Sequence, residues 1–198
     1  MIGDAFDKIF QDAPGRIIIA QFSSQMNRIQ QVINSAKRFG RKVALSGRSM
    51  ETYVNIAMKL GYLRVPDNLL IDIRKVNTLD PTKVVILSTG SQGEEYSSLV
   101  RISEGEHRHV KLDKNDTVVI SASVVPGNED AVDKLINNLF REGADVIHSK
   151  IMTDIHVSGH PSREELKLMF ALTQPRYFTP INGDYHRMVE HGKEAVDK

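Results

Sequence analysis

The strongest constraint on the fold is a short run of β-branched residues followed directly by a helical pattern. Residues 16–22 contain Ile17-Ile18-Ile19 without polar alternation, which is typical of a strand covered on both faces. Residues 27–39 then repeat apolar side chains at helical spacing and stop at Gly40, where a positive φ is tolerated. A strand covered on both faces requires helices above and below the sheet.

The same alternation continues along the chain. We expect strands at 16–22, 42–47, 69–73, 83–88, 117–121, 146–148 and 177–181. We expect helices at 4–11, 27–39, 49–60, from 95 to about 102, from 129 onward, from 161 to about 172, and after Gly183. Strands that alternate with helices over short connections predict an α/β fold with an open, mostly parallel sheet and helices on both faces.

Composition excludes several classes of protein. The 198 residues are 40% hydrophobic and 26% charged, enough for one ordinary domain, or one domain and part of another, with a real core. There is no cysteine, so disulfides are excluded and His, Asp and Glu are the only plausible metal ligands. No apolar run suits a membrane span or an export signal. We therefore expect a cytoplasmic protein without membrane contacts.

Net charge limits the kind of nucleic-acid binding that the chain can show. It is +1, so there is no global basic field, and any nucleic-acid site must be local. In open parallel sheets, ligands bind beyond the carboxyl ends of the strands. The segments that fall there are 23–27, 46–49, 88–94, 121–128 and 154–160.

The segment 154–160, Asp-Ile-His-Val-Ser-Gly-His, offers two imidazoles, a hydroxyl and a glycine just before a predicted helix. Donors at a helix N-terminus favour an anion, and a phosphate fits best. Gly159 and Pro161 disfavour a zinc pair at helical spacing. A turn with a capping Ser158 and solvated histidines is the alternative, and His-x-x-x-His alone does not decide between them.

Three further segments have weaker signals. Residues 89–94, Thr-Gly-Ser-Gln-Gly-Glu, lack the lysine of a Walker loop, and they either line a phosphate path or form a tight turn. Residues 23–28 are ordinary helix-capping residues that become candidate phosphate or base contacts at the same sheet edge, with Met26 placed to stack. The basic cluster formed by Arg101, residues 107–109 and Lys111 is more typical of a solvated loop.

Taken together, five motifs resemble the ribonuclease J family of metallo-β-lactamase-fold nucleases, specifically the β-CASP domain inserted into that fold. The motifs are Ser-Gly-Arg-Ser-Met-Glu (46–51), Leu-Ser-Thr-Gly-Ser-Gln-Gly-Glu (87–94), Pro-Gly-Asn-Glu (126–129), Asp-Ile-His-Val-Ser-Gly-His (154–160) and Pro-Ile-Asn-Gly-Asp (180–184). Their order and spacing are those of the family, and the match covers essentially the whole chain. The resemblance implies a β-CASP domain at 1–160 and, at 161–198, the start of the segment that returns into the metallo-β-lactamase domain.

The resemblance also implies roles for residues. RNA would be contacted by Gln25, Met26, Asn27, His156, Val157, Ser158, Gly159 and His160. His156 and Ser158 would hold a nucleotide phosphate, and His160 would be the catalytic residue that assists the leaving group. Asn182 stands where active members have a zinc-ligating histidine, and an amide is a poorer zinc ligand than imidazole.

Active members use zinc or manganese. The main cluster of His and Asp residues that bind this metal would belong to a region preceding Met1. The resemblance therefore implies that this chain binds no metal and is inactive alone. Its parent would be a weakly active second paralogue of ribonuclease J that acts on 5′-monophosphorylated single-stranded RNA, in exo or endo mode, rather than on DNA. It would assemble as a homo-oligomer or with the paralogous subunit. A non-catalytic RNA-binding and assembly subunit is the main alternative, and an unrelated α/β protein that binds a small phosphorylated ligand is a third.

Overall fold

The structure is a computed structural model that describes residues 2–148, 161–181 and 183–196. The chain divides into two compact units, Met1–Val157 and Ser158–Lys198. The division expected from the sequence, after residue 160, stays a prediction.

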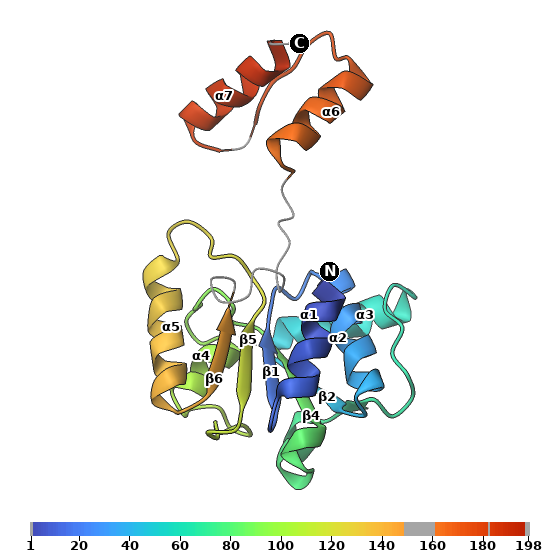
Figure 1. The fold of residues 1–198 in the computed structure, drawn as a ribbon, viewed down its shortest axis with the longest axis vertical. Helices are drawn as coiled ribbons and strands as arrows, with labels where there is room; N and C mark the ends of the chain where they lie inside the picture. Colours follow the sequence, from blue (N-terminus) through green and yellow to red (C-terminus); the bar gives the residue numbers. More distant parts are fainter. Residues whose placement is uncertain (1, 149–160, 182, 197–198) are drawn as a thin grey trace. The chain divides into compact units, whose positions relative to one another are not determined.

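The first unit is built on a six-stranded sheet in which every pairing is parallel, with the order β3-β2-β4-β1-β5-β6 (Figure 1). The strands are β1 (Ile17–Ala20), β2 (Lys42–Ser46), β3 (Leu70–Ile71), β4 (Val84–Ser88), β5 (Thr117–Ile120) and β6 (Asp145–His148). The predicted α/β class with an open parallel sheet is confirmed. β1 lies at the centre, between β4 and β5.

Helices cover both faces of this sheet (Figure 1). They are α1 (Ile2–Asp12), α2 (Met26–Arg38), α3 (Arg48–Lys59), α4 (Ser98–Ser103) and α5 (Glu129–Arg141), with 3-10 turns η1 (Ile73–Thr78) and η2 (Pro81–Lys83). Alternating residues of one strand supply the two cores. Ile17 and Ile19 pack with α1, α2 and α3, whereas Ile18 packs with α4 and α5. All three isoleucines are fully buried, as expected for a central parallel strand.

One expected strand is much shorter than the sequence pattern suggests. Of residues 69–73, only Leu70 and Ile71 pair, and they pair with β2. The Asp72 side chain accepts a hydrogen bond from the Arg74 backbone N–H at 2.8 Å and so starts η1. A capping carboxylate therefore ends the strand where the apolar pattern alone would continue it.

The second unit contains α6 (Arg163–Thr173) and α7 (Tyr185–Val196). α6 begins with a capping box: the Ser162 hydroxyl accepts from the Glu165 N–H, and the Glu165 carboxylate accepts from the Ser162 N–H at 2.6 Å. The two helices meet at an aromatic cluster of Phe170, Phe178 and His191, in which Phe178 lies 4.8 Å from each of the other two ring centroids.

The strand expected at residues 177–181 is wrong. These residues form neither strand nor helix. The Phe178 side chain packs edge-on against Phe170 of α6, so the aromatic residues that suggested a strand serve helix packing here. A strand also needs a neighbour to pair with, and no described segment of the second unit is a strand.

Candidate nucleic-acid interface

The strand ends of the first unit meet at one edge of the sheet, which we call the carboxyl edge. Ala20, Ser46 and Ser88 lie in one register row. Backbone bonds continue one residue further: the Gln21 N–H donates to the Ser88 carbonyl at 3.2 Å, and the Ser121 N–H donates to the Ala20 carbonyl at 2.8 Å. The segments after β1, β2, β4 and β5 therefore start side by side, as the sequence predicted.

The first of these segments leads into α2. Gln25 is the N-cap, and its side chain makes no capping hydrogen bond. Gln25 and Asn27 are exposed, whereas Met26 is half-buried against the core. The first turn of α2 carries no acidic residue. Two exposed amides therefore stand at the positive end of a helix dipole, where they suit an anionic or hydrogen-bonding ligand. The Met26 side chain packs against the core with its buried part.

A buried arginine fixes this helix to the residue that follows β5. The Arg28 guanidinium donates through Nη1 to the Ser121 carbonyl at 2.5 Å. Arg28 is only 5% exposed, and burial lowers the pKa of its guanidinium. The buried guanidinium thus holds the start of α2 against the residue that follows β5, at the carboxyl edge.

The glycine-rich turn at residues 89–94 holds another part of the edge in place. The Gln92 amide donates through Nε2 to the Ser123 carbonyl at 2.9 Å, and its Oε1 accepts from the Val125 N–H at 2.7 Å. Gly93 has a φ of 69°, and a Cβ there would meet the backbone of Ala131 in α5 at 2.6 Å. The turn therefore packs tightly on α5 and positions the loop between β5 and α5.

Ser46, at the end of β2, contacts an imidazole, which raises the question of nucleophilic chemistry. Its hydroxyl lies 3.0 Å from His107 Nε2 and 2.5 Å from the Ser98 hydroxyl. His107 Nδ1, however, accepts from the backbone N–H of Val110 at 3.1 Å and of His109 at 3.3 Å. Nε2 then carries the proton and donates to Ser46, the opposite of what a general base requires. Burial is the main cause that lowers the pKa of His107. The pair is structural.

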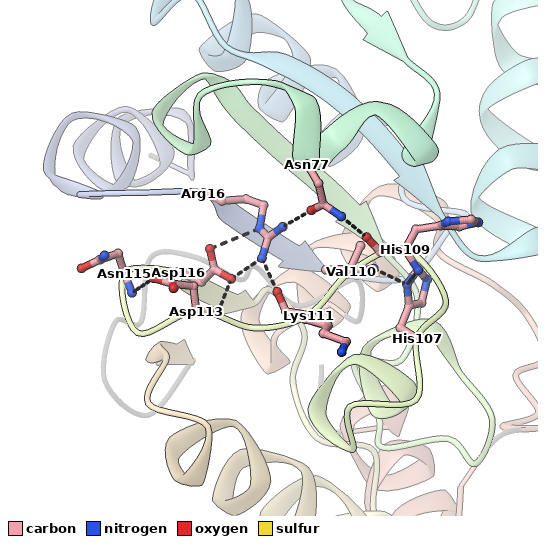
Figure 2. A network of polar contacts seen from close by, with 9 residues as sticks. All are labelled: Arg16, Asn77, His107, His109, Val110, Lys111, Asp113, Asn115 and Asp116. Atoms are coloured by element: carbon pink, nitrogen blue, oxygen red, sulfur yellow. Dashed lines mark hydrogen bonds and ion pairs between the residues drawn. The ribbon is translucent and has the colours of Figure 1, made fainter.

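Part of the basic cluster, namely His107, His109 and Lys111, belongs to a structural network that is shown in Figure 2. Asn77 donates to the His109 carbonyl at 2.8 Å, and Arg16 donates to the Lys111 carbonyl at 2.6 Å. Arg16 also pairs with Asp116 at 2.5 Å, with both side chains buried. The cluster is therefore only in part the solvated loop that the sequence suggested, because its backbone and His107 join β2 to the start of β1.

Gln21 is a residue that sequence reasoning missed. It is 1% exposed at the centre of the carboxyl edge, and within the described residues neither its side-chain oxygen nor its nitrogen has a hydrogen-bond partner. A buried amide without partners is costly, so such a group marks a place that calls for a polar ligand. An amide directly after an apolar strand was the available signal.

The remaining candidates fall outside the part of the chain that the structure describes. These are His156, Val157, Ser158, Gly159, His160 and Asn182. Within the described residues, no three His, Cys, Asp or Glu side chains come together as metal ligands would, and exposed His186 is no exception. Among the described residues, therefore, no set of side chains fits the zinc or manganese centre that the resemblance implies for active members of the family. No described helix is long and apolar enough to cross a bilayer.

The fold and the edge define a class: an α/β domain with an all-parallel sheet that presents polar, rigidly held loops at its carboxyl edge. The family model described as "Ribonuclease J, beta-CASP domain" matches residues 14–139. The chain belongs to the ribonuclease J family, and it contains that family's β-CASP domain.

Individual relatives agree. The chain is 43% identical to Ribonuclease J 1 of Streptococcus pyogenes over all of its length, 44% identical to Ribonuclease J of Thermus thermophilus over 94% of it, and 40% identical to Ribonuclease J2 of Bacillus subtilis over 98%. It spans about a third of the length of these curated relatives, between 32% and 35%. The identities are too similar to assign the chain to one paralogue.

Proposed function

We propose that this chain is the RNA-binding β-CASP portion of a ribonuclease J-type enzyme that hydrolyses single-stranded RNA in cytoplasmic processing and decay of rRNA and mRNA. The observation that carries the proposal is the carboxyl edge of a ribonuclease J-family domain, with the amides of Gln25 and Asn27 exposed at the N-terminus of α2. Exposed amides at the positive end of a helix dipole suit the phosphates and base edges of RNA.

Each residue has a separate task in this proposal. Gln25 and Asn27 donate hydrogen bonds to the RNA, and Met26 supports a base from its half-buried position. His156 and Ser158, with Val157 and Gly159 between them, hold the phosphate of a 5′-monophosphorylated end. His160 gives a proton to the leaving oxygen as water adds to phosphorus and the P–O bond breaks. Zinc or manganese would supply Lewis acidity and a more acidic water in active members of the family.

Asn182 decides how much hydrolysis remains. The amide side chain is neutral and binds zinc less strongly than imidazole, so the parent protein is proposed to be weakly active. The same residue favours the second candidate, a non-catalytic subunit that binds RNA and assembles with an active paralogue or with further copies of itself.

The two candidates are separated by an activity assay of the full-length protein on 5′-monophosphorylated RNA with Mn²⁺ or Zn²⁺. We expect weak hydrolysis that Asn182→His increases and that further His160→Ala removes. Hydrolysis by the unmodified protein at the rate of an active homologue contradicts the role given to Asn182. If Asn182→His remains inactive while RNA still binds, the assembly subunit is favoured.

RNA binding itself is tested with two double variants, Gln25→Ala with Asn27→Ala and His156→Ala with Ser158→Ala. Each should weaken the affinity for 5′-monophosphorylated RNA at least about tenfold, since hydrogen bonds to a charged group contribute about 1.5–3 kcal/mol each. Asn137→Ala, which removes an exposed amide of α5, is the control and should bind like the unmodified protein. Unchanged affinity in both double variants contradicts the proposed interface.

A further inference from the structure

One face of α2 continues away from the carboxyl edge as a stripe of polar side chains. Asn27, Gln30, Asn34 and Lys37 follow at spacings of three, four and three residues, which places them on one side of the helix. Asn27, Asn34 and Lys37 are exposed. Ten residues of helix correspond to about 15 Å. The stripe starts within the proposed RNA-contacting residues, so a strand that leaves them can follow it.

A groove lies along this stripe, which we call the α2 groove. It has a volume of about 710 Å³ and is bounded by Gln30, Asn34 and Lys37 of α2, and by Tyr62, Arg64 and Pro66 in the segment after α3. Among the described residues that line it, none is acidic. Amides, two cations and a tyrosine are the side-chain types that bind single-stranded nucleic acid.

The segment opposite α2 is held rigidly. The Gln30 amide donates through Nε2 to the Arg64 carbonyl at 2.9 Å, and its Oε1 accepts from the Arg64 N–H at 2.8 Å. On the other side of Tyr62, the N–H groups of Tyr62 and Leu63 both donate to the Ala57 carbonyl, at 2.9 and 3.2 Å. Leu63 is buried at 3% exposure. The backbone on both sides of Tyr62 is therefore fixed.

These contacts keep the Tyr62 ring in solvent, where it is 77% exposed. A tyrosine side chain on a fixed backbone has only two rotatable bonds to order, so it loses little entropy when a ligand stacks on its ring. Exposed Tyr96 offers a contrast, because the cavity beside it is lined by three carboxylates, Glu95, Glu104 and Glu106, against two cations, Arg101 and Lys134, so its net charge is unfavourable for phosphate. Tyr62 instead lies with Lys37 and Arg64.

We propose that the α2 groove is a second contact region for single-stranded RNA, in which a nucleobase stacks on Tyr62 and the neighbouring phosphates pair with Lys37 and Arg64. This inference rests on the proposed RNA-binding function. It extends the interface from the carboxyl edge along α2, so that long RNAs gain contacts that short RNAs cannot reach.

Length-dependent binding tests the proposal. The full-length protein is titrated, in EDTA to prevent metal-dependent hydrolysis, into fluorescent 5′-monophosphorylated oligouridylates of about 4 and about 16 nucleotides, the range over which single-strand sites vary. Tyr62→Ala should weaken binding of the long RNA about tenfold and leave the short RNA unchanged. Tyr62→Phe keeps the ring and should bind like the unmodified protein. Tyr53→Ala, which removes an exposed tyrosine of α3, is the matched control.

Salt dependence provides an independent measurement. Each phosphate contact contributes about 0.7 to the slope of log K against log salt for single strands, so Lys37→Gln with Arg64→Gln should reduce the slope for the long RNA by about 1.4. Lys114→Gln with Arg141→Gln removes two exposed cations elsewhere and should leave it unchanged.

The outcomes separate this inference from the proposed function. If the unmodified protein binds neither RNA, both fail. If it binds the RNAs and Tyr62→Ala binds the long one equally well, only the α2 groove is overturned. Because Tyr62 is exposed, Tyr62→Ala should unfold in urea at the same midpoint as the unmodified protein. Equal midpoints show that any loss of affinity in Tyr62→Ala comes from the lost RNA contact and not from lost stability.

Discussion

His107 makes the stability of the first unit depend on pH. Its Nδ1 accepts two backbone N–H bonds, so protonation of that nitrogen breaks both of them. Burial first, and then the nearby His109 and Arg101, lower the pKa of His107 in the folded protein below its ordinary value of about 6.5. The unfolded chain therefore takes up this proton at a higher pH than the folded one. The stabilisation is complete above about pH 6.5 and is lost as the pH falls from there through the lower folded value.

We expect the free energy of unfolding in urea to fall between pH 7.5 and pH 5, and to fall less in His107→Asn. The asparagine oxygen replaces Nδ1 as an acceptor but does not titrate. The difference between the two proteins isolates His107 from the other histidines. An identical pH dependence in both would contradict this assignment.

The role of His107 was beyond sequence reasoning. The residues around it suggested a basic, solvated loop, and the hydroxyl that it contacts belongs to Ser46, 61 positions earlier. Arg16 and Asp116 are 100 positions apart, and they pair only because β1 and β5 are neighbours. Periodicity reveals the element to which a residue belongs, but not the partner of a buried polar group.

Among the elements, the turn at residues 89–94 and the loop after β5 act together through one side chain. Gln92 is 3% exposed, and it satisfies both the Ser123 carbonyl and the Val125 N–H. Gln92→Leu keeps the approximate size but leaves two backbone groups without their partner. We expect a loss of about 1–3 kcal/mol in the free energy of unfolding and faster hydrogen exchange at the Val125 amide. Gln11→Leu, at an exposed position of α1, should change neither.

Exchange at Val125 that remains slow in Gln92→Leu would show that this loop is held by other contacts. The sequence indicated a tight turn or a phosphate path at residues 89–94. The turn is present, and its glutamine holds a neighbouring loop, which no pattern within the motif could reveal.

Most elements were predictable because their apolar spacing is regular. The helix expected at 27–39 is α2 at Met26–Arg38, and the strand expected at 83–88 is β4 at Val84–Ser88. The failures occurred where a local contact competes with the pattern: Asp72 ends β3 early, and Phe178 packs between helices rather than in a strand. The order of the strands was also not predictable, since it depends on pairings between distant segments.

For the whole molecule, the two units differ in how completely they bury apolar surface. The first has a core on each face of its sheet, and β1, β4 and β5 are almost entirely buried. In the second, within residues 161–181 and 183–196, Phe170 is the one buried apolar side chain, while Leu172, Tyr177 and Ile181 are at least 74% exposed. The first unit therefore has the core that independent folding requires, whereas residues 161–181 and 183–196 by themselves do not supply one.

We expect residues 1–148 alone to unfold in urea in one cooperative transition, with the steepness typical of a domain of that size, about 1–3 kcal/mol/M. A peptide of residues 161–198 should show little helix by circular dichroism and no cooperative transition, because a pair of helices around one aromatic cluster does not offset the entropy of ordering them. A cooperative transition in the peptide would show that the aromatic cluster of Phe170, Phe178 and His191 is a sufficient core. Non-cooperative unfolding of residues 1–148 would show that the sheet depends on residues beyond His148. Cooperative folding of residues 1–148 would also allow the contributions of Gln25, Asn27 and Tyr62 to RNA binding to be measured without the histidines at 156 and 160.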